Sequence, residues 1–169
     1  YNEESIPDSI DDYGKSKLEG EICDEKNVIT IRLSLIGHEL NSNLQLIDWF
    51  LSQEKKVNGY KKAIFSGITN IELFNILEKY IINNNSLNGL YHVSANPIDK
   101  FSILDITSKI YKKDIIILPD ETVTVDRSLD STRFKKITSY IPPSWEEMIR
   151  KLYENSRFYN RNWSSHFKY

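Results

Sequence analysis

Tyr13 and Lys17 stand four residues apart in the stretch Tyr-Gly-Lys-Ser-Lys-Leu-Glu-Gly-Glu, which begins at Tyr13. Residues i and i+4 of a helix share one face, so the phenol and the ammonium can meet there. A neighbouring ammonium favours the phenolate and lowers the pKa of a tyrosine from its usual value of about 10. Such a tyrosine can donate a proton to a carbonyl oxygen as hydride arrives, and the ammonium can bind a ribose hydroxyl. The spacing is that of a proton-transfer pair.

A Tyr-x-x-x-Lys spacing is weakly specific on its own. Because the chain has 10 tyrosines and is rich in lysine, about one such pair is expected by chance. The residues alone favour an exposed helix on which the tyrosine packs against lysine methylene groups. The surrounding sequence is needed to distinguish a proton-transfer pair from an exposed structural helix.

The segments that must position this pair alternate between helical and strand patterns. A helix is predicted over 8–26, because Asp and Ser residues suited to a helix start precede a run without proline. The β-branched segment 28–37 predicts a strand buried on both faces, as in a parallel sheet. Further helices are predicted over 44–54, 70–82, 101–111, 131–137 and 145–156, and further strands over 63–65, 90–94 and 115–118, with a polar turn over 55–62. This alternation indicates an α/β architecture with parallel strands.

The composition excludes several classes of function. With 40% hydrophobic and 27% charged residues and a net charge of −2, the chain has no basic excess for binding nucleic acid. No apolar run reaches the roughly 20 residues that span a membrane, and the acidic first residues do not resemble a secretory signal. Three scattered histidines and one cysteine form no metal-ligand cluster. The lone Cys23 excludes an internal disulfide and fits a reducing compartment, so we expect a cytoplasmic protein without a metal.

The first residue of the chain is Tyr1, and its one methionine is Met148. We therefore expect a fragment of a longer protein whose front is missing. The six glycines nowhere form the Gly-x-Gly-x-x-Gly pattern that holds a dinucleotide pyrophosphate at a helix start. A cofactor-binding loop of that kind is absent from these 169 residues.

Several short motifs occur in one order between Tyr1 and about Leu152. Together they resemble the extended short-chain dehydrogenase/reductases, and within these the dTDP-4-dehydrorhamnose reductases. Each motif is loosely specific, whereas their common order is much more specific than any one of them. The motifs are the loop 1–7 with its Tyr-x-Glu-x-x-x-Pro pattern and the segments 13–21, 32–37, 67–69, 89–94, 126–131 and 142–145.

The resemblance implies the C-terminal part of a Rossmann-type parallel sheet with a small α/β substrate-binding domain. Residues 1–36 and 63–95 would be the remnant of an NAD(P)-binding domain, residues 37–62 and 96–156 the substrate-binding domain, and residues 157–169 a tail. The implied cofactor is NADP or NAD. The implied substrate is a nucleotide sugar, and the reaction reduces the 4-keto group of its deoxysugar. A homodimer is compatible with the resemblance.

By resemblance, Tyr13 is the catalytic acid/base, Lys17 lowers its pKa, and both residues contact the cofactor. The family's third catalytic residue is a Ser or Thr upstream of the tyrosine. Ser5 and Ser9 are too close to Tyr13 to take that role. We therefore expect no turnover from these residues alone, and we expect exposed hydrophobic strand edges where the sheet is incomplete.

Arg127 and His38 are the candidates for binding the substrate. The planar guanidinium of Arg127 suits the diphosphate of a nucleotide sugar, and the alternative is a surface ion pair with Asp126 or Asp130. His38 follows a strand-ending glycine, and ligands of this fold gather at the carboxyl ends of strands. Asp130, with Ser131, is expected to cap the following helix rather than to bind ligand.

Other residues are expected to be structural. Arg32 lies in a buried strand and so needs an ion-pair partner, with contact to a ligand as the alternative. His92 is expected to be a hydrogen-bonded core residue. Trp49 and Phe50 are at core spacing, with a place in a sugar or base pocket as the alternative. Cys23 is expected on the Tyr13 helix, and His166 in the tail.

Two other functions stay open beside the reductase. One is an epimerase or dehydratase of nucleotide sugars from the same superfamily, in which the cofactor is oxidised and reduced again within one turnover. The other is a non-catalytic regulatory subunit on the same scaffold, against which an intact Tyr13–Lys17 pair argues.

Overall fold

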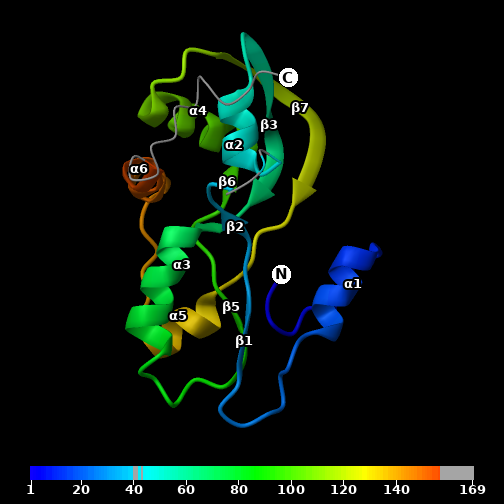
Figure 1. Cartoon of the computed structure of the whole chain (residues 1–169). Coiled ribbons are helices and arrows are strands. Elements are labelled where there is room, and N and C mark those ends of the chain that lie inside the picture. Colours follow the sequence, from blue (N-terminus) through cyan, green and yellow to red (C-terminus); the bar gives the residue numbers. More distant parts are fainter. Residues whose placement is uncertain (40–41, 43, 157–169) are drawn as a thin grey trace.

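The computed structural model describes residues 1–39, 42 and 44–156. The predicted tail at 157–169, with His166, lies outside the described residues. Figure 1 shows strands alternating with helices, which confirms the predicted α/β class. The helices are α1 (Asp12–Glu19), α2 (Leu46–Ser52), α3 (Asn70–Ile76) continued by the π-helical η1 (Leu77–Ile81), α4 (Lys100–Tyr111), α5 (Thr132–Thr138) and α6 (Trp145–Ser156), and the strands are β1 (Ile29–Arg32), β2 (Leu35–Ile36), β3 (Lys56–Phe65), β4 (Ile68–Thr69), β5 (Gly89–His92), β6 (Ile98–Asp99) and β7 (Ile116–Asp126).

The described strands form three small sheets that are mostly parallel. β1 pairs in parallel with β5, with Ile29 opposite Gly89 and Arg32 opposite His92. β2 pairs in parallel with β4. In the third sheet β3 is central, parallel to β7 and antiparallel to β6. The parallel pairing confirms the predicted sheet type, and it brings the carboxyl ends of paired strands to a common edge.

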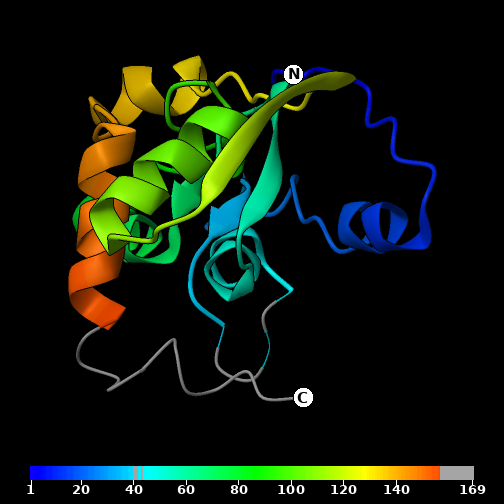
Figure 2. The same ribbon diagram turned by 90° about the horizontal axis from the view of Figure 1, so that it is seen from above.

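One hydrophobic core extends from the third sheet and helices α2, α4 and α6 to the strands β2, β4 and β5 and the helices α3 and α5. α4 packs against β3, and α6 packs against α4 (Figures 1 and 2). Burial of apolar side chains, at about 25 cal/mol per Å², is the main force that holds these layers together. The fully buried side chains from α2, α4 and α6 are Ile47, Phe50, Ile103, Leu104, Met148, Ile149 and Leu152.

The start of α6 shows how a local signal sets a helix. The Ser144 hydroxyl accepts a hydrogen bond from the Glu147 N–H at 3.2 Å, and the Glu147 carboxylate accepts one from the Ser144 N–H at 2.8 Å. This reciprocal capping box follows Pro142 and Pro143, which separate α6 from the preceding segment. α6 therefore begins at Trp145, and its range matches the one that the sequence predicts.

Two helices are shorter than predicted. α1 begins after Asp11, whose side chain accepts a hydrogen bond from the Gly14 N–H, and it ends before Gly20. Cys23 therefore lies beyond α1, and its expected place on the helix was wrong. α2 begins two residues later than predicted, and Leu44 before it is exposed.

The predicted polar turn over 55–62 was wrong, because most of it belongs to the ten-residue strand β3. Buried Val57 and Gly59 alternate with exposed Lys56 and Asn58, which is the period-two pattern of a half-buried strand. The segment was predicted as a turn because of its many polar residues, and the alternation of buried and exposed positions was overlooked.

β7 is also longer than predicted. The sequence predicted a strand that stops before Pro119, whereas β7 continues through Pro119 to Asp126. In the described sheet β7 is an edge strand. The N–H that proline lacks can face away from β3 there, so no ladder hydrogen bond is lost.

The strand predicted over 28–37 as buried on both faces is in fact two strands, β1 and β2. The residues of β1 are half-buried, and Leu35 in β2 is 43% exposed. Each of the two strands pairs with a single neighbour among the described residues. The hydrophobic run predicted burial on both faces. A strand with a neighbour on one side only stays partly exposed instead.

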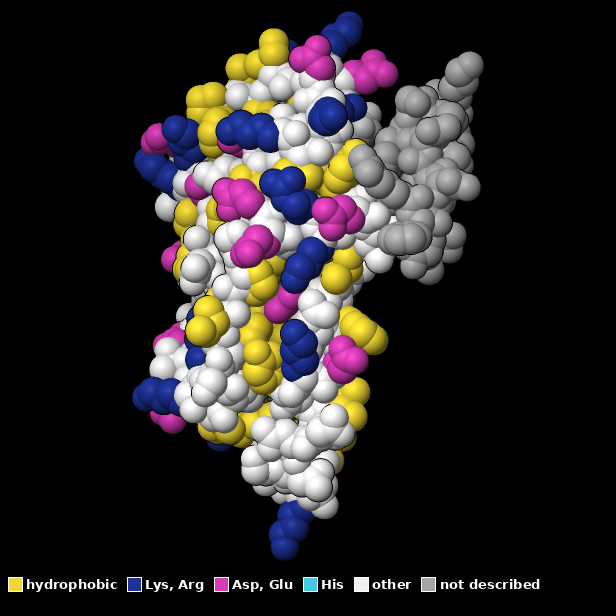
Figure 3. All heavy atoms as spheres, turned by 90° about the vertical axis from the view of Figure 1, so that its left-hand side faces the viewer, with side chains coloured by type: hydrophobic (Ala, Val, Ile, Leu, Met, Phe, Trp, Pro, Cys, Tyr) yellow, Lys and Arg dark blue, Asp and Glu magenta, His cyan; other side chains and the backbone are white. Residues whose placement is uncertain are grey.

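The described surface carries charges of both signs. Figure 3, which views the left-hand side of Figure 1, shows Lys and Arg interspersed with Asp and Glu on this face. Among the described helices, none is long and apolar enough to cross a lipid bilayer.

Candidate functional site

α1 positions Tyr13 and Lys17 on one helical face, as the spacing predicts. The Asp11 carboxylate accepts the Gly14 N–H at 2.6 Å and so fixes the first turn. Lys17 Nζ lies 5.5 Å from the centroid of the Tyr13 ring, within the range of a cation–π contact. The Tyr13 side chain is 74% exposed. The pair is thus formed and open to a bound molecule.

The segment around this pair exposes apolar surface. α1 buries none of its own residues, and Figure 1 shows it standing apart from the helices that enclose the core. Ile6 is 86% exposed, Ile10 89% and Ile22 50%. Exposed apolar side chains gathered on one segment mark a surface that suits contact with other protein.

Arg127 follows β7, and its N–H donates to the Ile64 carbonyl at 2.9 Å. In the described part of the chain its guanidinium forms no ion pair, so the alternative pairing with Asp126 or Asp130 was wrong. Asp126 instead accepts the Ser128 N–H at 2.8 Å. The Arg127 side chain is exposed.

Asp130 caps α5 as predicted, whereas Ser131 does not. The Asp130 carboxylate accepts the Thr132 N–H at 2.8 Å, and hydrogen bonding by Thr132 lowers the pKa of Asp130. The side chain of Ser131 makes no capping bond. Its hydroxyl is buried against that of Ser94, 2.8 Å away.

A polar pocket of about 300 Å³ opens between the loop after β5 and the loop after β7. Both loops follow the carboxyl ends of strands that have parallel partners, where ligands of open α/β sheets bind. Arg127 directly precedes the second loop. The residues that line the pocket are Tyr1, Ser94, Ala95, Asn96, Pro97, Ser128, Leu129, Asp130, Ser131 and Lys135.

His38 follows β2 and belongs to a half-buried network. Its Nδ1 lies 2.6 Å from an oxygen of Asp48, and its Nε2 lies 2.8 Å from the hydroxyl of Tyr111. Asp48 is 1% exposed and also accepts the Glu39 N–H. Burial, and then the charge of Asp48, raises the pKa of Tyr111, so its phenol stays protonated at neutral pH. Both ring nitrogens of His38 thus have protein partners.

Arg32 and His92 lie opposite each other on β1 and β5. The guanidinium of Arg32 binds Glu21 through two hydrogen bonds of 2.6 and 2.7 Å, which confirms the predicted structural ion pair. His92 is buried as predicted, but neither ring nitrogen has a hydrogen-bond partner in the described residues, so the expected hydrogen bond was wrong. Burial lowers the pKa of His92, which keeps the ring neutral.

The aromatic pair on α2 divides between core and surface. Phe50 is fully buried, whereas Trp49 is 36% exposed. No group of three or more His, Cys, Asp and Glu side chains with metal-binding geometry occurs among the described residues.

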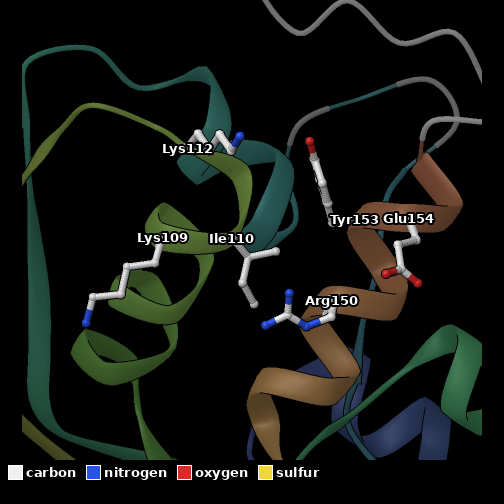
Figure 4. Close-up of a pocket in the computed structure, with 6 residues that line it drawn as sticks. All are labelled: Lys109, Ile110, Lys112, Arg150, Tyr153 and Glu154. Carbon is white, nitrogen blue, oxygen red and sulfur yellow. The ribbon is translucent and has the colours of Figure 1, made fainter.

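A second, shallow cavity of about 400 Å³ lies between α4 and α6 (Figure 4). Ile110 and Arg150 point toward one another across it, and Lys109 points away. The cavity contains none of the candidate residues from the sequence, and Lys109 is already paired with Asp105 at 2.6 Å.

The structure brings together Tyr13 with Lys17, and it places Arg127 beside the polar pocket. His38 belongs to a separate network with Asp48 and Tyr111. Sequence reasoning missed the pocket residues Asn96 and Lys135, and it missed both partners of His38. The position of Asn96 just after a predicted strand was the one available signal, because loops at strand ends carry ligand contacts.

No protein-family model matches this sequence, and no curated protein is significantly similar to it. Solved structures are similar in fold. The dTDP-4-dehydrorhamnose reductase from Bacillus anthracis in complex with NADP has a TM-score of 0.73 and 20% identity over 92% of this chain and 59% of that one. The Yersinia enterocolitica dTDP-4-dehydrorhamnose reductase has a TM-score of 0.71 and 21% identity over 90% and 59%. UDP-N-acetylglucosamine 4-epimerase from Bacillus cereus has a TM-score of 0.58 and 10% identity over 76% and 47%.

The chain therefore spans about three fifths of the length of the reductases that it matches. At this level of identity the likeness establishes the fold. It confirms the predicted resemblance to the C-terminal part of the extended short-chain dehydrogenase/reductase fold.

Proposed function

We propose that this chain is the proton-transferring and substrate-binding part of an NAD(P)-dependent nucleotide-sugar oxidoreductase that reduces a 4-keto-deoxysugar nucleotide. The observation that carries the proposal is the exposed Tyr13–Lys17 pair, one helical turn apart. The shared fold with dTDP-4-dehydrorhamnose reductases supports it.

In this proposal Tyr13 donates a proton to the oxygen of the 4-keto group. Lys17 places its positive charge beside the phenol and favours the negative charge left on the tyrosine after proton transfer. NADP or NAD, when bound, supplies the hydride. Lys17 is also the residue that would hold the ribose of the cofactor, and its ammonium and Tyr13 are open enough to accept it. The phosphates of the cofactor need groups beyond these 169 residues, which contain no glycine-rich loop.

Arg127 is proposed to bind the diphosphate of the substrate, because its guanidinium is exposed and has no carboxylate partner among the described residues. We also propose that His38 binds the substrate. Since Asp48 and Tyr111 hold its ring nitrogens, a direct contact requires His38 to exchange one of these bonds.

The proposed division into domains follows from the same roles. Residues 1–36 and 63–95 would complete a dinucleotide-binding domain, and residues 37–62 and 96–156 would hold the substrate. β3 crosses the boundary between residues 62 and 63, so the two parts share one continuous strand.

The test uses the natural polypeptide that contains residues 1–169. Oxidation of NADPH is followed with a dTDP-4-keto-6-deoxysugar as substrate. Replacement of Tyr13 by Phe is expected to lower kcat by about 10²–10⁴-fold, the contribution of a positioned acid. Tyr60→Phe, in β3, is the matched control and should keep wild-type activity. Equal kcat values for Tyr13→Phe and wild type would refute the assigned role.

A nucleotide-sugar epimerase is the second candidate, favoured by the likeness to the Bacillus cereus 4-epimerase. An epimerase returns the hydride to the sugar within one turnover and consumes no cofactor. Stoichiometric loss of NADPH with product formation supports the reductase. Conversion of the sugar without loss of NADPH supports the epimerase.

A further inference from the structure

We propose that Arg32 and Glu21 form a positioning pair that holds α1, and with it Tyr13 and Lys17, at the carboxyl end of β1. The inference rests on the proposed function and deepens it, because it assigns the residues that place the proton-transfer pair. Arg32 and Glu21 need no contact with substrate or cofactor for this role. They act through the helix that carries Tyr13 and Lys17.

Within the described part of the chain, apolar packing does not hold α1. The helix buries none of its residues, and Figures 1 and 2 both show it apart from the other described helices. Ile6, Ile10 and Ile22 beside it are each at least half exposed. The charged residues Glu3 and Glu21, in contrast, are partly buried. The segment thus exposes apolar side chains and covers carboxylates, so polar contacts set its position.

Two side chains of β1 hold the chain where it leaves α1. The Arg32 guanidinium donates to the two carboxylate oxygens of Glu21 at 2.6 and 2.7 Å. The Thr30 hydroxyl accepts the Ile22 N–H at 3.2 Å and donates to the Ile22 carbonyl at 2.7 Å. Because Thr30 and Arg32 are two positions apart on a strand, their side chains leave the same face. One face of β1 therefore fixes two consecutive residues after the helix.

The Arg32–Glu21 pair has the geometry of a rigid link. Two parallel hydrogen bonds between a planar guanidinium and a carboxylate fix the orientation of the groups as well as their distance. The two side chains are 23% and 16% exposed, and partly buried pairs are screened less by salt than surface pairs are. Hydrogen bonding by Glu21 also raises the pKa of Arg32.

The path from Glu21 back to Lys17 is short and hydrogen-bonded. The Glu21 N–H donates to the Leu18 carbonyl at 3.1 Å, and the Gly20 N–H donates to the Ser16 carbonyl at 3.2 Å. The last turn of α1 therefore continues into the residues that β1 holds. A displacement of Glu21 would move the helix end that carries Lys17.

The chain that leads into α1 is held at the same edge. A carboxylate oxygen of Glu3 accepts the His92 N–H at 2.8 Å, and His92 lies opposite Arg32 on β5. Both contacts are thus made at the last residues of two parallel strands, the edge at which ligands of open α/β sheets bind. The polar contacts place the proton-transfer pair with respect to this edge.

The test measures kcat of the natural polypeptide that contains this chain, with NADPH and a dTDP-4-keto-6-deoxysugar, well below the unfolding midpoint of each variant. Arg32→Met is expected to lower kcat by about 10–100-fold, because misplacing reacting groups by about 1 Å has an effect of that order. Arg32→Lys keeps the charge and one donor and should recover part of the loss. Lys62→Met is the matched control, since it removes the cation of the exposed pair with Glu121, and it should keep the wild-type kcat.

A double-variant cycle tests whether the two residues act as one link. Glu21→Gln keeps the size of the side chain and is expected to lower kcat in the same direction, which also provides a test if Arg32→Met does not fold. The double variant Glu21→Gln, Arg32→Met should lose no more activity than Arg32→Met alone, because one link is lost only once. Fully additive losses would refute the pair.

The pH dependence of kcat distinguishes a displaced helix from a melted one. Tyr13 and Lys17 move together when α1 is displaced, so the alkaline limb of the profile should lie at the same pH in Arg32→Met and in wild type. A limb shifted to higher pH in Arg32→Met would show that Tyr13 has lost the charge of Lys17. That result would overturn the positioning role in favour of a purely structural one.

The outcomes separate this inference from the proposed function. If wild type turns over and neither Arg32→Met nor Glu21→Gln lowers kcat, the positioning role is refuted while the proposed function stands. If wild type neither oxidises NADPH nor converts the sugar, the proposed function fails and the positioning role with it.

Discussion

Buried polar side chains in this protein differ in how well their hydrogen bonds are satisfied. Asp48 is 1% exposed and joins His38 and the Glu39 N–H, so its charge is compensated by two hydrogen-bonding groups from the segment after β2. His92 is equally buried, yet its ring nitrogens lack partners among the described residues. We therefore expect Asp48 to stabilise the fold through its hydrogen bonds, and we expect His92 to make the stability depend on pH.

Asp48→Asn is expected to destabilise the fold by about 1–3 kcal/mol, because it weakens charge-assisted hydrogen bonds at a buried site. The measurement is urea unfolding at pH 7. Asp105→Asn is the matched control, since Asp105 pairs with Lys109 at the surface, and exposed pairs contribute about 1 kcal/mol or less. A smaller effect for Asp48 than for Asp105 would contradict the importance of the network.

His92 is expected to make stability depend on pH. Because burial lowers the pKa of His92 in the folded state, the unfolded chain binds more protons once the pH falls below about 6.5. The free energy of unfolding should therefore fall between pH 7 and pH 5, by at most about 1.4 kcal/mol per pH unit from this group.

The comparison is with His92→Leu, which removes the titrating ring while the neighbouring Glu3 and Arg32 stay in place. The variant should show a shallower loss of stability over the same range. Identical pH dependence in the two proteins would mean that His92 is not buried in its neutral form.

At the scale of single elements, close contacts determine where β3 and α4 meet. A Cβ added at Gly59 would lie 2.9 Å from the backbone Cα of Phe101 and 2.9 Å from the side chain of Ile117. Neither backbone nor a branched side chain can move aside cheaply, so only glycine allows the helix to pack this near the strand.

Gly59→Ala is therefore expected to destabilise the protein by about 1–3 kcal/mol, as overpacking does. Gly20→Ala is the control, because its nearest neighbours would be 3.5 Å away and alanine lowers the entropy of the unfolded chain. Chemical denaturation of both variants checks the prediction. Equal stability of the two would show that α4 does not pack so closely on β3.

At the scale of the whole molecule, apolar residues of the segment 6–22, which contains Tyr13, stay outside the core. Ile6, Ile10 and Ile22 are each at least half exposed, and β1 pairs with one neighbour among the described residues. A strand edge next to apolar side chains is a site for association.

We therefore expect the purified 169-residue chain to self-associate and to bind a hydrophobic dye. Size-exclusion chromatography and dye fluorescence measure both effects, and the double variant Ile6→Ser, Ile10→Ser should reduce both. Leu44→Ser removes an equally exposed apolar residue outside this segment and serves as the control. A monomeric chain that binds no dye would contradict the expectation.

Much of this structure was predictable from local sequence, but not all of it. The start of α6 follows from the capping box of Ser144 and Glu147, and the face shared by Tyr13 and Lys17 follows from helical geometry. The lengths of β3 and β7 could not be predicted from local sequence. Their pairing keeps β3 extended despite its polar residues and β7 extended despite its proline.

The sequence by itself indicated the class of fold and the candidate proton-transfer pair, since the order of helices and strands and the face shared by Tyr13 and Lys17 depend on residues at most a few positions apart. The tertiary structure alone decided which distant residues meet. His38 is joined to Tyr111, 73 positions away, and Ser94 to Ser131, 37 positions away. Such contacts depend on how strands and helices pack, and no local pattern in the chain encodes that packing.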